Sequence, residues 1–340
     1  MAEPPALCSL PFDQYGRHRD ARDVAELIRA LEGPARLAVL DVGGYPGLSA
    51  RFLPADWVVI VDPAAAGTAE AGAAAYLRAS GLALPFQDAS FDLVLSLDSL
   101  EHVPAADRPR YLDELRRVAR RYVLLLAPFA SPEAERAEAL LFEYVKVALH
   151  AEHEQLREHR ACGLPDLPAT IAALTANGAA CHAFPSGYLY HWLPLMLLKH
   201  HLLSLDPRAG VHAALDRWYN AREPSADRWL PAYRWAVLVS KAGETASLRA
   251  AAERFVPRAP DAAAELLARQ DLQLVLSLLA LERGNRGPAA LEERLAHQER
   301  QIAALTHEVE ALRAHLAAIR RGRIMRLLNA ANHLLGRDAG

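Results

Sequence analysis

The chain has 340 residues, of which 52% are hydrophobic and 23% are charged, and its formal net charge is −3. This length and balance predict a folded core with appendages rather than a disordered chain, and the small net charge gives no reason to expect nucleic acid as a partner. Three scattered cysteines without a CxxC pair, no signal peptide and no membrane-length apolar run predict a cytoplasmic protein without a disulfide framework or a zinc ribbon.

The N-terminal part of the chain is expected to hold an arm and one helix. Residues 1–18 begin with a proline-rich stretch, and we interpret them as an irregular arm. From Arg19 to Leu31, apolar residues recur at helical spacing and predict an amphipathic helix, which Gly33-Pro34 ends. We expect one α/β domain to start with this helix and to extend over residues 19–241.

The next stretch has the pattern of a nucleotide-binding βαβ unit. A short apolar run from Leu37 stops at Asp41, and a second one, Trp57–Val61, stops at Asp62. Three glycines lie between the two runs: Gly43, Gly44 and Gly47. Glycines let the backbone approach a ligand at the end of the first strand, and an acid at the end of the second strand is placed to accept hydrogen bonds from ribose hydroxyls.

A second informative segment runs from Leu84 to His102. Phe91–Leu97 has the pattern of a buried strand, and three polar residues cluster just beyond its carboxyl end: Asp98, Glu101 and His102. In an open α/β sheet that edge is the ligand crevice. Further strands are expected at 75–78, 122–126, 179–184 and 235–240. Their alternation with helices favours a parallel, doubly wound sheet.

The region between the last two expected strands is predicted to be a helical insert over residues 188–230. It carries a large share of the aromatic side chains: Tyr188, Tyr190, His191, Trp192, Trp218, Tyr219 and Trp229. These rings can form the core of a cap, or they can stack on the rings of a sugar, and the sequence alone leaves both alternatives open. Residues 242–287 are expected to form a helical linker region.

The C-terminal part of the chain has a heptad pattern. From Leu291 to Ile319, seam residues, mostly apolar, alternate in steps of four and three over about four heptads, which predicts a coiled coil at 288–321 and a parallel homodimer. One long helix packed on its own domain is the alternative. The tail, 322–340, mixes arginines with apolar residues; an exposed helix end and peripheral contact with an anionic membrane are both open.

The glycine stretch decides between two kinds of nucleotide fold. The dinucleotide fingerprint G-x-G-x-x-G is absent. Asp41–Gly47 (DVGGYPG) instead resembles the first motif of the class I S-adenosylmethionine (SAM)-dependent methyltransferases, acid-x-Gly-x-Gly-x-Gly. Leu84–Val103 is similar to the LPF-x-D-x-SFD…LEH block of the small-molecule methyltransferases in that class. The resemblance covers about Tyr15 to Phe129, a third of the chain, and implies a Rossmann-like methyltransferase sheet with SAM as cofactor.

Carried over residue by residue, the resemblance implies a SAM site. Asp41 and the glycines Gly43, Gly44 and Gly47 would frame the loop under the methionine part of SAM. Asp62 would hold the ribose hydroxyls, Leu82 would offer a backbone contact to adenine, and Asp98 would lie near the sulfonium. The sequence departs from the family pattern in two places. Tyr45 replaces the middle glycine of the first motif, and Ser80 stands where many relatives have an acid.

The later segments carry a further resemblance. The stretch His153–Asp166 (HEQLREHRACGLPD), the aromatic insert and the terminal coiled coil resemble methyltransferases encoded with sugar-transfer enzymes for surface polysaccharides. This resemblance implies a small-molecule or glycan acceptor, with a hydroxyl oxygen of a sugar or glycolipid as the methylated atom. The alternative is a non-catalytic assembly protein that keeps the fold and scaffolds a polysaccharide-biosynthesis complex through its coiled coil.

Methyl transfer to a hydroxyl needs a general base, for which histidine is the commonest choice. His102 is the best-placed catalytic candidate, and Glu101 would orient His102 or the substrate; a supporting role for His102 in fixing the loop is the alternative. His191 is a weaker candidate base. His150 and His153 are expected to share one helical face, but no carboxylate signature accompanies them, and we predict no metal.

Overall fold

The computed structural model of the chain describes residues 5–33, 36–64, 74–205, 210–222, 226–256, 260, 262–284, 300 and 307. The chain divides into two compact units, Met1–Leu276 and Ser277–Gly340. Helix α11, Ala262–Gly284, begins in the first unit and ends in the second. The predicted coiled coil at 288–321 and the basic tail at 322–340 lie outside the described residues, apart from Arg300 and His307.

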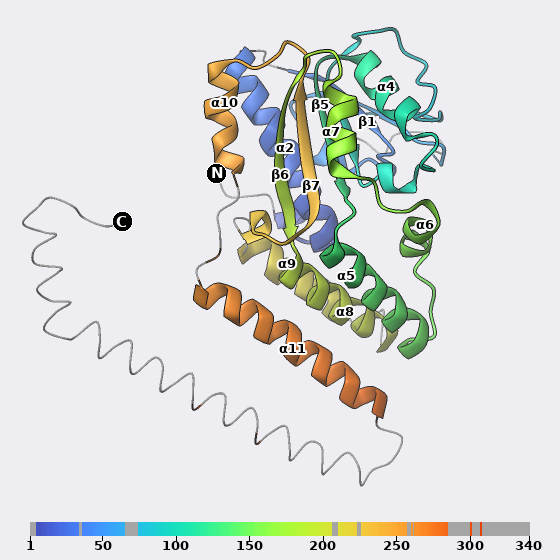
Figure 1. Ribbon diagram of the computed structural model, residues 1–340, viewed down its shortest axis with the longest axis vertical. Helices are drawn as coiled ribbons and strands as arrows, with labels where there is room; N and C mark the ends of the chain where they lie inside the picture. The colour runs from blue at the N-terminus through green and yellow to red at the C-terminus, as the bar shows by residue number, and fades with distance from the viewer. Residues whose placement is uncertain are drawn as a thin grey trace, which may run out of the picture. The chain divides into compact units, whose positions relative to one another are not determined.

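Within the described residues, seven strands form one sheet in the order β3-β2-β1-β4-β5-β7-β6 (Figure 1). Their bounds are β1 Ala38–Val42, β2 Trp57–Val61, β3 Ala74–Leu77, β4 Phe91–Leu97, β5 Ala119–Pro128, β6 Ala180–Tyr188 and β7 Ala232–Ser240. The strand order reverses between β1 and β4, because the chain leaves the β3 edge and returns on the other side of β1. In open α/β sheets, ligands bind at such a switch point.

The expectation of a wholly parallel sheet is wrong at β7. This strand runs antiparallel to both of its neighbours, β5 and β6, whereas the other pairs are parallel. The reason lies in the insert between β6 and β7. Tyr188, at the end of β6, pairs with Ala232, at the start of β7, so the insert leaves and re-enters the sheet at the same edge. Such a connection joins antiparallel strands.

Helices cover both faces of the sheet. Successive side chains of a strand point to opposite faces; Val39 of β1 packs against α2, Phe12–Glu32, and α10, Ala246–Ala252. Its neighbour Leu40 packs in the core that α4, Arg108–Val118, and α7, Leu167–Thr175, build on the other face. Figure 1 shows these two layers on either side of the strands. Helix α3, Leu48–Phe52, is the short helix between β1 and β2.

The remaining helices gather at the carboxyl edge of the sheet (Figure 1). They are α5 Pro132–Glu143, a π-helical turn Tyr144–Ala148, α6 Glu154–Cys162, α8 Leu189–Leu205 and α9 Val211–Arg222, with one-turn 3₁₀ helices η1 Leu100–His102 and η3 Ala226–Arg228. The described residues of the insert lie mainly in α8 and α9. Its place at the carboxyl edge sets it beside the strand ends.

An irregular arm was expected over residues 1–18, but the described part of it, residues 5–18, is largely helical. Helix α1, Pro5–Cys8, precedes α2, which begins at Phe12, seven residues before the predicted start. The early turns are fixed by contacts with α9: the Phe12 amide donates to Asp216 Oδ1 at 2.8 Å, and Asn220 Nδ2 donates to the Leu10 carbonyl at 2.8 Å. These partners are about 200 residues away, so helical periodicity near the N-terminus could not show them.

Residues beyond the last strand continue the first unit. Phe255, in the 3₁₀ turn η4 Glu253–Phe255 after α10, stacks on Phe184 of β6 with ring centroids 4.6 Å apart. Part of the expected linker therefore packs into the core. Among the described helices, none has the length and apolar composition needed to cross a membrane.

Candidate functional site

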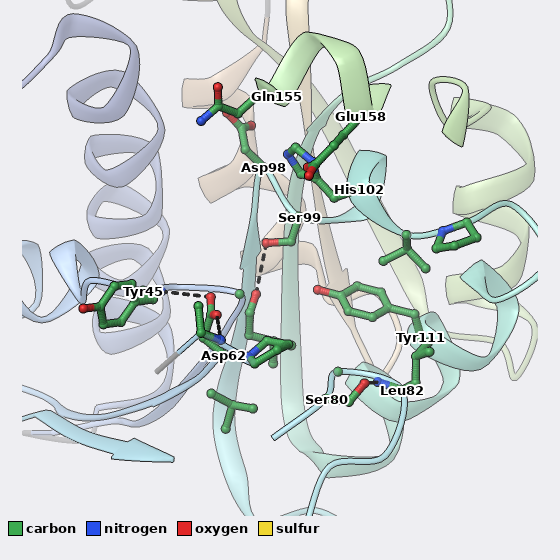
Figure 2. Close-up of a pocket in the computed structure, with 18 residues that line it drawn as sticks. Tyr45, Asp62, Ser80, Leu82, Asp98, Ser99, His102, Tyr111, Gln155 and Glu158 are labelled. Atoms are coloured by element: carbon green, nitrogen blue, oxygen red, sulfur yellow. Dashed lines mark hydrogen bonds and ion pairs between the residues drawn. The ribbon is translucent and has the colours of Figure 1, made fainter. Parts of the chain in front are cut away.

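Two clefts open at the carboxyl edge of the sheet. The first, called here the strand-end cleft, has a volume of about 710 Å³. Its lining comes from the ends of β1 and β2 with the loops that follow them, residues 80–82, residues 98, 99 and 102–104, Tyr111 of α4, and two residues of α6 (Figure 2). The second, the insert cleft, has a volume of about 440 Å³ and is lined by the start of α2, η1, α5, α6, α8 and β7.

The glycines of the first motif have steric reasons to be glycine. Gly43 and Gly47 have φ of 80° and 100°, a backbone region that L-residues rarely adopt. A Cβ on Gly43 would strike Ser99 Oγ, one on Gly44 would strike the carboxylate of Asp41, and one on Gly47 would strike the Tyr76 hydroxyl. Gly43 lines both clefts. Gly44 and Gly47 line neither cleft, but their lack of a Cβ allows the loop to pack against Asp41 and Tyr76.

Asp41 lies beneath this loop rather than in a cleft. The strand expected to stop at Asp41 runs on to Val42, and the residue pairs with Ile60 and Leu95 in the middle of the sheet. Its side chain is fully buried, and this burial raises the pKa of Asp41 to about 6, although the Ser49 hydroxyl partly opposes the shift. The structure therefore gives Asp41 a place under Gly44, where it supports the loop.

Asp62 stands at the end of β2, as predicted, and its carboxylate lies in the strand-end cleft (Figure 2). Its Oδ1 accepts a hydrogen bond from the Ala64 amide at 2.7 Å, and its Oδ2 accepts a longer one from the Tyr45 amide at 3.4 Å. A carboxylate has about four acceptor positions. Asp62 therefore ties two loops together and keeps acceptor capacity for hydroxyl groups of a ligand.

The far wall of the strand-end cleft is formed by residues 80–82 and Tyr111. The Leu82 amide donates to Ser80 Oγ at 3.2 Å, so Ser80 holds the turn that presents Leu82. Gly81 lacks a Cβ where the Tyr111 ring packs. Together with Val61 and Pro104, these residues make a largely apolar wall. Leu82 is therefore placed in the cleft that its predicted contact with adenine requires.

Five residues line both clefts and mark where they meet: Gly43, Tyr45, Asp98, His102 and Gln155. Four of them come from the two segments predicted to bind a ligand, and Gln155 comes from α6. Tyr45 is 47% exposed; its backbone amide lies on the Asp62 side, and its ring extends away from Asp62 (Figure 2). Gln155 lies in the stretch His153–Asp166, which carried a family resemblance but no predicted contact. Its place in the clefts follows from the packing of α6 beside η1.

Asp98 holds the centre of an ion-pair network. Its carboxylate accepts from Arg234 Nε at 2.7 and 2.8 Å and from Arg17 Nη1, and Arg234 Nη2 also donates to Asp13 at 2.7 Å. Burial would raise the pKa of Asp98, but the charges of Arg234 and Arg17 outweigh it and hold this pKa well below its usual range. Asp98 lies at the predicted crevice edge, and two arginines offset its charge.

His102 lies at the junction of the clefts, with Glu158 of α6 as its partner. Nδ1 of His102 is 2.7 Å from Glu158 Oε2. Burial lowers the pKa of His102, the neighbouring His159 lowers it further, and Glu158 partly opposes both. The imidazole is therefore neutral near pH 7. With Nδ1–H donated to Glu158, Nε2 is left as the proton acceptor.

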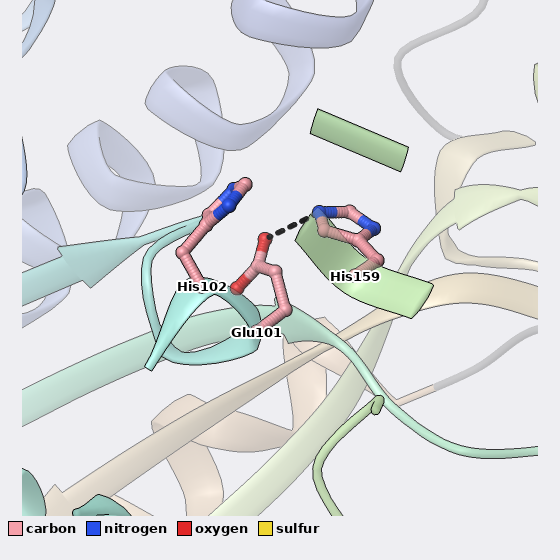
Figure 3. Close-up of side chains that lie close together, drawn as sticks. All are labelled: Glu101, His102 and His159. Carbon is pink, nitrogen blue, oxygen red and sulfur yellow. Dashed lines mark ion pairs between the residues drawn. The ribbon is translucent and has the colours of Figure 1, made fainter. Parts of the chain in front are cut away.

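Glu101 does not orient His102, which corrects that part of the sequence interpretation. Its side chain is buried, and its Oε1 faces His159 Nε2 at 3.9 Å (Figure 3). Burial and the nearby charge of Asp98 raise the pKa of Glu101 well above its usual range. The orienting carboxylate is Glu158, which lies 56 residues further along the chain. Only the fold of α6 against η1 brings the two together.

The histidine pair His150 and His153 does not share a helical face, so that expectation is wrong. The helix breaks after Ala148; His150 has φ of 52°, and His153 caps α6 by accepting a hydrogen bond from the Leu156 amide at 3.3 Å. His191, the weaker candidate base, packs edge-on against Tyr188 with ring centroids 4.9 Å apart. It lines neither cleft.

The aromatic residues of the insert mostly build its core. The rings of Tyr188, His191, Tyr219 and Trp229 contact one another edge-on or tilted. Trp192 is the member of the predicted set that lines the insert cleft. Its ring stacks on Tyr233 with centroids 3.6 Å apart, and its Nε1 donates to Asp13 at 2.8 Å. Of the two alternatives for these aromatic residues, the four contacting rings therefore follow the first: they form the core of the cap.

Comparison with known proteins finds a family match for the segment from β1 to β5. The family model of the methyltransferase domain matches residues 40–126, from β1 to β5. An uncharacterized methyltransferase of Mycobacterium marinum is 40% identical over 135 residues, which cover 33% of this chain and 52% of that one. One of Mycolicibacterium vanbaalenii is 40% identical over 117 residues, covering 30% and 45%. The chain thus spans about half the length of these curated relatives.

Residues 40–126 therefore match the methyltransferase domain, and this match and the relatives support a methyltransferase of class I. Among solved structures, the YcgJ protein from Bacillus subtilis is 18% identical, with a TM-score of 0.38, and covers 66% of this chain and all of that one. A likeness at that level adds nothing to the assignment. The family match confirms the class predicted from the two sequence motifs.

Proposed function

We propose that the chain transfers a methyl group from SAM, bound in the strand-end cleft, to an acceptor bound in the insert cleft. The observation that carries this proposal is the meeting of the two clefts at Gly43, Asp98 and His102. A transfer reaction needs donor and acceptor to be held side by side, and positioning supplies much of the rate. The match of residues 40–126 to the methyltransferase domain supports the same assignment.

The residues of the strand-end cleft fit SAM. The cleft volume of 710 Å³ lies within the range of about 300–1,000 Å³ usual for small-molecule sites. Asp62 has acceptor capacity for the ribose hydroxyls, and the apolar wall with Leu82 and Val61 suits the adenine ring. The backbone at Gly43 is open to the methionine part. Tyr45 would serve as a wall at the cleft edge.

When bound, SAM supplies a methyl carbon already activated by its sulfonium, and S-adenosylhomocysteine (SAH) is the product. The protein has to orient the acceptor and, for a hydroxyl, to remove its proton. His102 is the candidate for that proton. It faces both clefts, and Glu158 holds Nδ1 so that Nε2 can accept.

For the acceptor we propose a hydroxyl oxygen of a sugar or glycolipid. Three cationic side chains line the insert cleft, Arg17, Lys199 and Arg234, and each is paired with a carboxylate. This charge balance favours an uncharged polar ligand over an ion. Neighbouring groups such as Gln14, Gln155 and His200 can donate or accept hydrogen bonds, as a polyhydroxylated acceptor requires.

A labelling experiment tests this function. The full-length protein is incubated with methyl-labelled SAM and either a carbohydrate extract or a polar-lipid extract of the source cells. We expect label in a glycan or glycolipid, and no label with the His102→Asn variant. Label in neither extract, from protein shown to bind SAM, would contradict the proposed acceptor. Failure to bind SAM at all would contradict the enzyme and favour the assembly-protein alternative.

Two further proposals concern the C-terminal region. We propose that residues 288–321 form the coiled coil of a homodimer and that residues 322–340 contact a membrane surface peripherally; their support is the heptad and basic apolar patterns of the sequence. A chain ending at Arg283 is expected to lose the dimer in light scattering. An unchanged mass per particle would contradict the coiled-coil proposal.

A further inference from the structure

Three side chains gather on one wall of the insert cleft: Glu101, His102 and His159 (Figure 3). Glu101 and His102 come from η1, and His159 comes from α6. Each side chain can offer one metal-ligand atom, and these atoms all lie within 4.8 Å of one another. The wall therefore presents two imidazoles and a carboxylate to the same small space.

Both imidazoles are held in the same way. His102 Nδ1 lies 2.7 Å from Glu158 Oε2, and His159 Nδ1 lies 2.8 Å from Glu138 Oε1. Glu138 is itself fixed, because its Oε1 also accepts from the Tyr233 hydroxyl at 2.7 Å. A carboxylate on Nδ1 fixes the tautomer and leaves Nε2 with a free lone pair, the arrangement that supports histidine ligands in metal sites.

Glu101 supplies an independent observation. Its side chain is only 1% exposed, and its Oε2 has no hydrogen-bond partner among the described residues. Its Oε1 lies 3.9 Å from His159 Nε2, which is too long for a hydrogen bond. A buried carboxylate oxygen without a partner is costly. A cation placed between Glu101 and the two imidazoles would satisfy it.

We propose that Glu101, His102 and His159 bind a divalent transition-metal ion of the Zn²⁺ type, with one coordination position open to the insert cleft. Two imidazoles and one carboxylate with an open position form a ligand set of catalytic zinc sites. With bonds of about 2.1 Å at tetrahedral angles, two ligand atoms lie about 3.4 Å apart. The Glu101–His159 distance of 3.9 Å therefore has to shorten by about half an ångström, and the widest separation, 4.8 Å, by about 1.4 Å, which rotations of the side chains would supply. Mg²⁺ prefers oxygen ligands, and two imidazoles disfavour it.

The role of the ion rests on the proposed methyl transfer, whereas the binding site does not. The acceptor hydroxyl would coordinate at the open position, and its proton would leave to water as the O–H bond is polarised. The oxygen then attacks the methyl carbon, a C–O bond forms, and the S–C bond breaks with its electron pair going to sulfur. In the loaded protein His102 is a ligand, and the ion takes over the task that a free His102 would have as base.

Metal binding to the untagged full-length protein tests the inference. After treatment with a chelator and its removal, Zn²⁺ is titrated calorimetrically into the wild type, His159→Asn, Glu101→Gln and Glu138→Gln. We expect one equivalent in the wild type, and Glu138→Gln should weaken binding by about 10- to 100-fold, because outer carboxylates tune their histidines. The two ligand variants should weaken it at least as much. His150→Asn is the matched control: His150 is exposed and lines neither cleft, and asparagine tolerates its positive φ.

Absence of stoichiometric Zn²⁺ binding, equal affinity in His159→Asn and wild type, or a preference for Mg²⁺ would each overturn the inference. Thermal unfolding of every variant shows which ones are folded, and Glu138→Gln, which leaves all three ligands in place, keeps the test valid if a ligand variant does not fold. SAH titrated into the same samples separates the two proposals: SAH binding without Zn²⁺ binding overturns the metal site alone. If transfer survives chelation and His159→Asn, His102 acts as a free base and the proposed role of the ion is wrong.

Discussion

The strand-end cleft and the insert cleft lie side by side, but the chain builds them in different ways. The strand-end cleft is formed largely by consecutive strand ends and loops between Val42 and Tyr111, with α6 added at one side. The insert cleft joins the start of α2 to β7 through pairs such as Asp13 and Arg234, which are 221 residues apart. A local sequence motif can thus specify one cleft, whereas the other depends on contacts across the whole fold.

The two clefts also differ in electrostatics. In the strand-end cleft, the Asp62 carboxylate accepts hydrogen bonds from the backbone amides of Tyr45 and Ala64, its only partners among the described residues, and it lines the cleft. In the insert cleft, Asp98 is bound by Arg17 and Arg234, and Lys199 donates to both oxygens of Asp216 at 2.8 Å. The strand-end cleft thus has a carboxylate with acceptor capacity for a ligand. In the insert cleft, the charged side chains pair with one another and hold distant elements together.

The largest effect is expected where the clefts meet. His102→Asn should lower kcat by about 10²- to 10⁴-fold, whether the imidazole acts as base or as ligand, because the acceptor proton is then removed less efficiently. SAH affinity should change less than about threefold, since Asp62 and the Leu82 wall are untouched. Single-turnover kinetics and calorimetry measure the two quantities. A kcat close to that of the wild type would show that the junction has no part in catalysis.

The next largest effect concerns the ion pairs that hold the insert cleft. Arg234 is buried and pairs with Asp13 and Asp98. Arg234→Met should lower the free energy of unfolding by about 3 kcal/mol, since it leaves buried carboxylates with fewer partners. Urea unfolding measures it. Arg249→Met removes an exposed pair with Glu244 and should leave the midpoint unchanged. Equal midpoints for both variants would contradict the difference drawn between the clefts.

A pH effect is expected from His18, on the α2 turn next to Arg17. Burial lowers the pKa of His18 to about 3, and the charge of Arg17 adds to the shift. The unfolded chain, with a histidine pKa of 6.5, binds more protons between pH 3 and 6.5, so stability is complete above that range and is lost as pH falls. His18 should contribute a loss of about 2 kcal/mol in unfolding free energy between pH 7.5 and pH 5.

The variant His18→Phe isolates this contribution, because it keeps a ring against Phe52, whose centroid lies 5.6 Å away. Urea unfolding at pH 7.5 and pH 5 should show a smaller loss of stability than in the wild type. His150→Asn, which alters an exposed histidine, should keep the full loss. An identical pH dependence in His18→Phe and the wild type would show that His18 is not held neutral by burial.

The smallest effect is expected at Tyr45, the residue that departs from the family motif. The residue lines both clefts, and Tyr45→Ala should raise the Kd for SAH by roughly three- to tenfold, as expected for loss of one aromatic side chain at the cleft edge. Trp57→Ala, at a ring that is 61% exposed and outside both clefts, should leave the Kd unchanged. Tighter SAH binding in Tyr45→Ala would mean that the ring obstructs the cleft.

Elements with strong local patterns were predictable from the sequence. Trp57–Val61 and Phe91–Leu97 are strands with the predicted bounds, because each is a run of apolar side chains closed by an acid or a turn. The place of Asp62 and Asp98 follows directly, since a residue just after a parallel strand lies at the carboxyl edge. The nucleotide half of the candidate site could therefore be located before the fold was known.

Features that depend on distant contacts were not predictable in this way. The early start of α2 depends on α9, the direction of β7 depends on where the insert returns, and the Glu158 partner of His102 depends on how α6 packs. Periodicity and motifs contain no information about such pairs. The break after Ala148, which separates His150 from His153, was likewise hidden in a sequence that looks continuously helical.

In the proposed function, the strand-end cleft binds SAM through Asp62. Calorimetric titration of SAH into the full-length protein tests it most directly, with Asp62→Ala as the variant and Asp113→Ala, at an exposed acid of α4, as the control. We expect one equivalent of SAH to bind to the wild type and the control. Affinity should fall by about 100-fold or more in Asp62→Ala, because charge-assisted hydrogen bonds to the ribose are lost. No binding by the wild type, or equal binding by Asp62→Ala, would contradict the account.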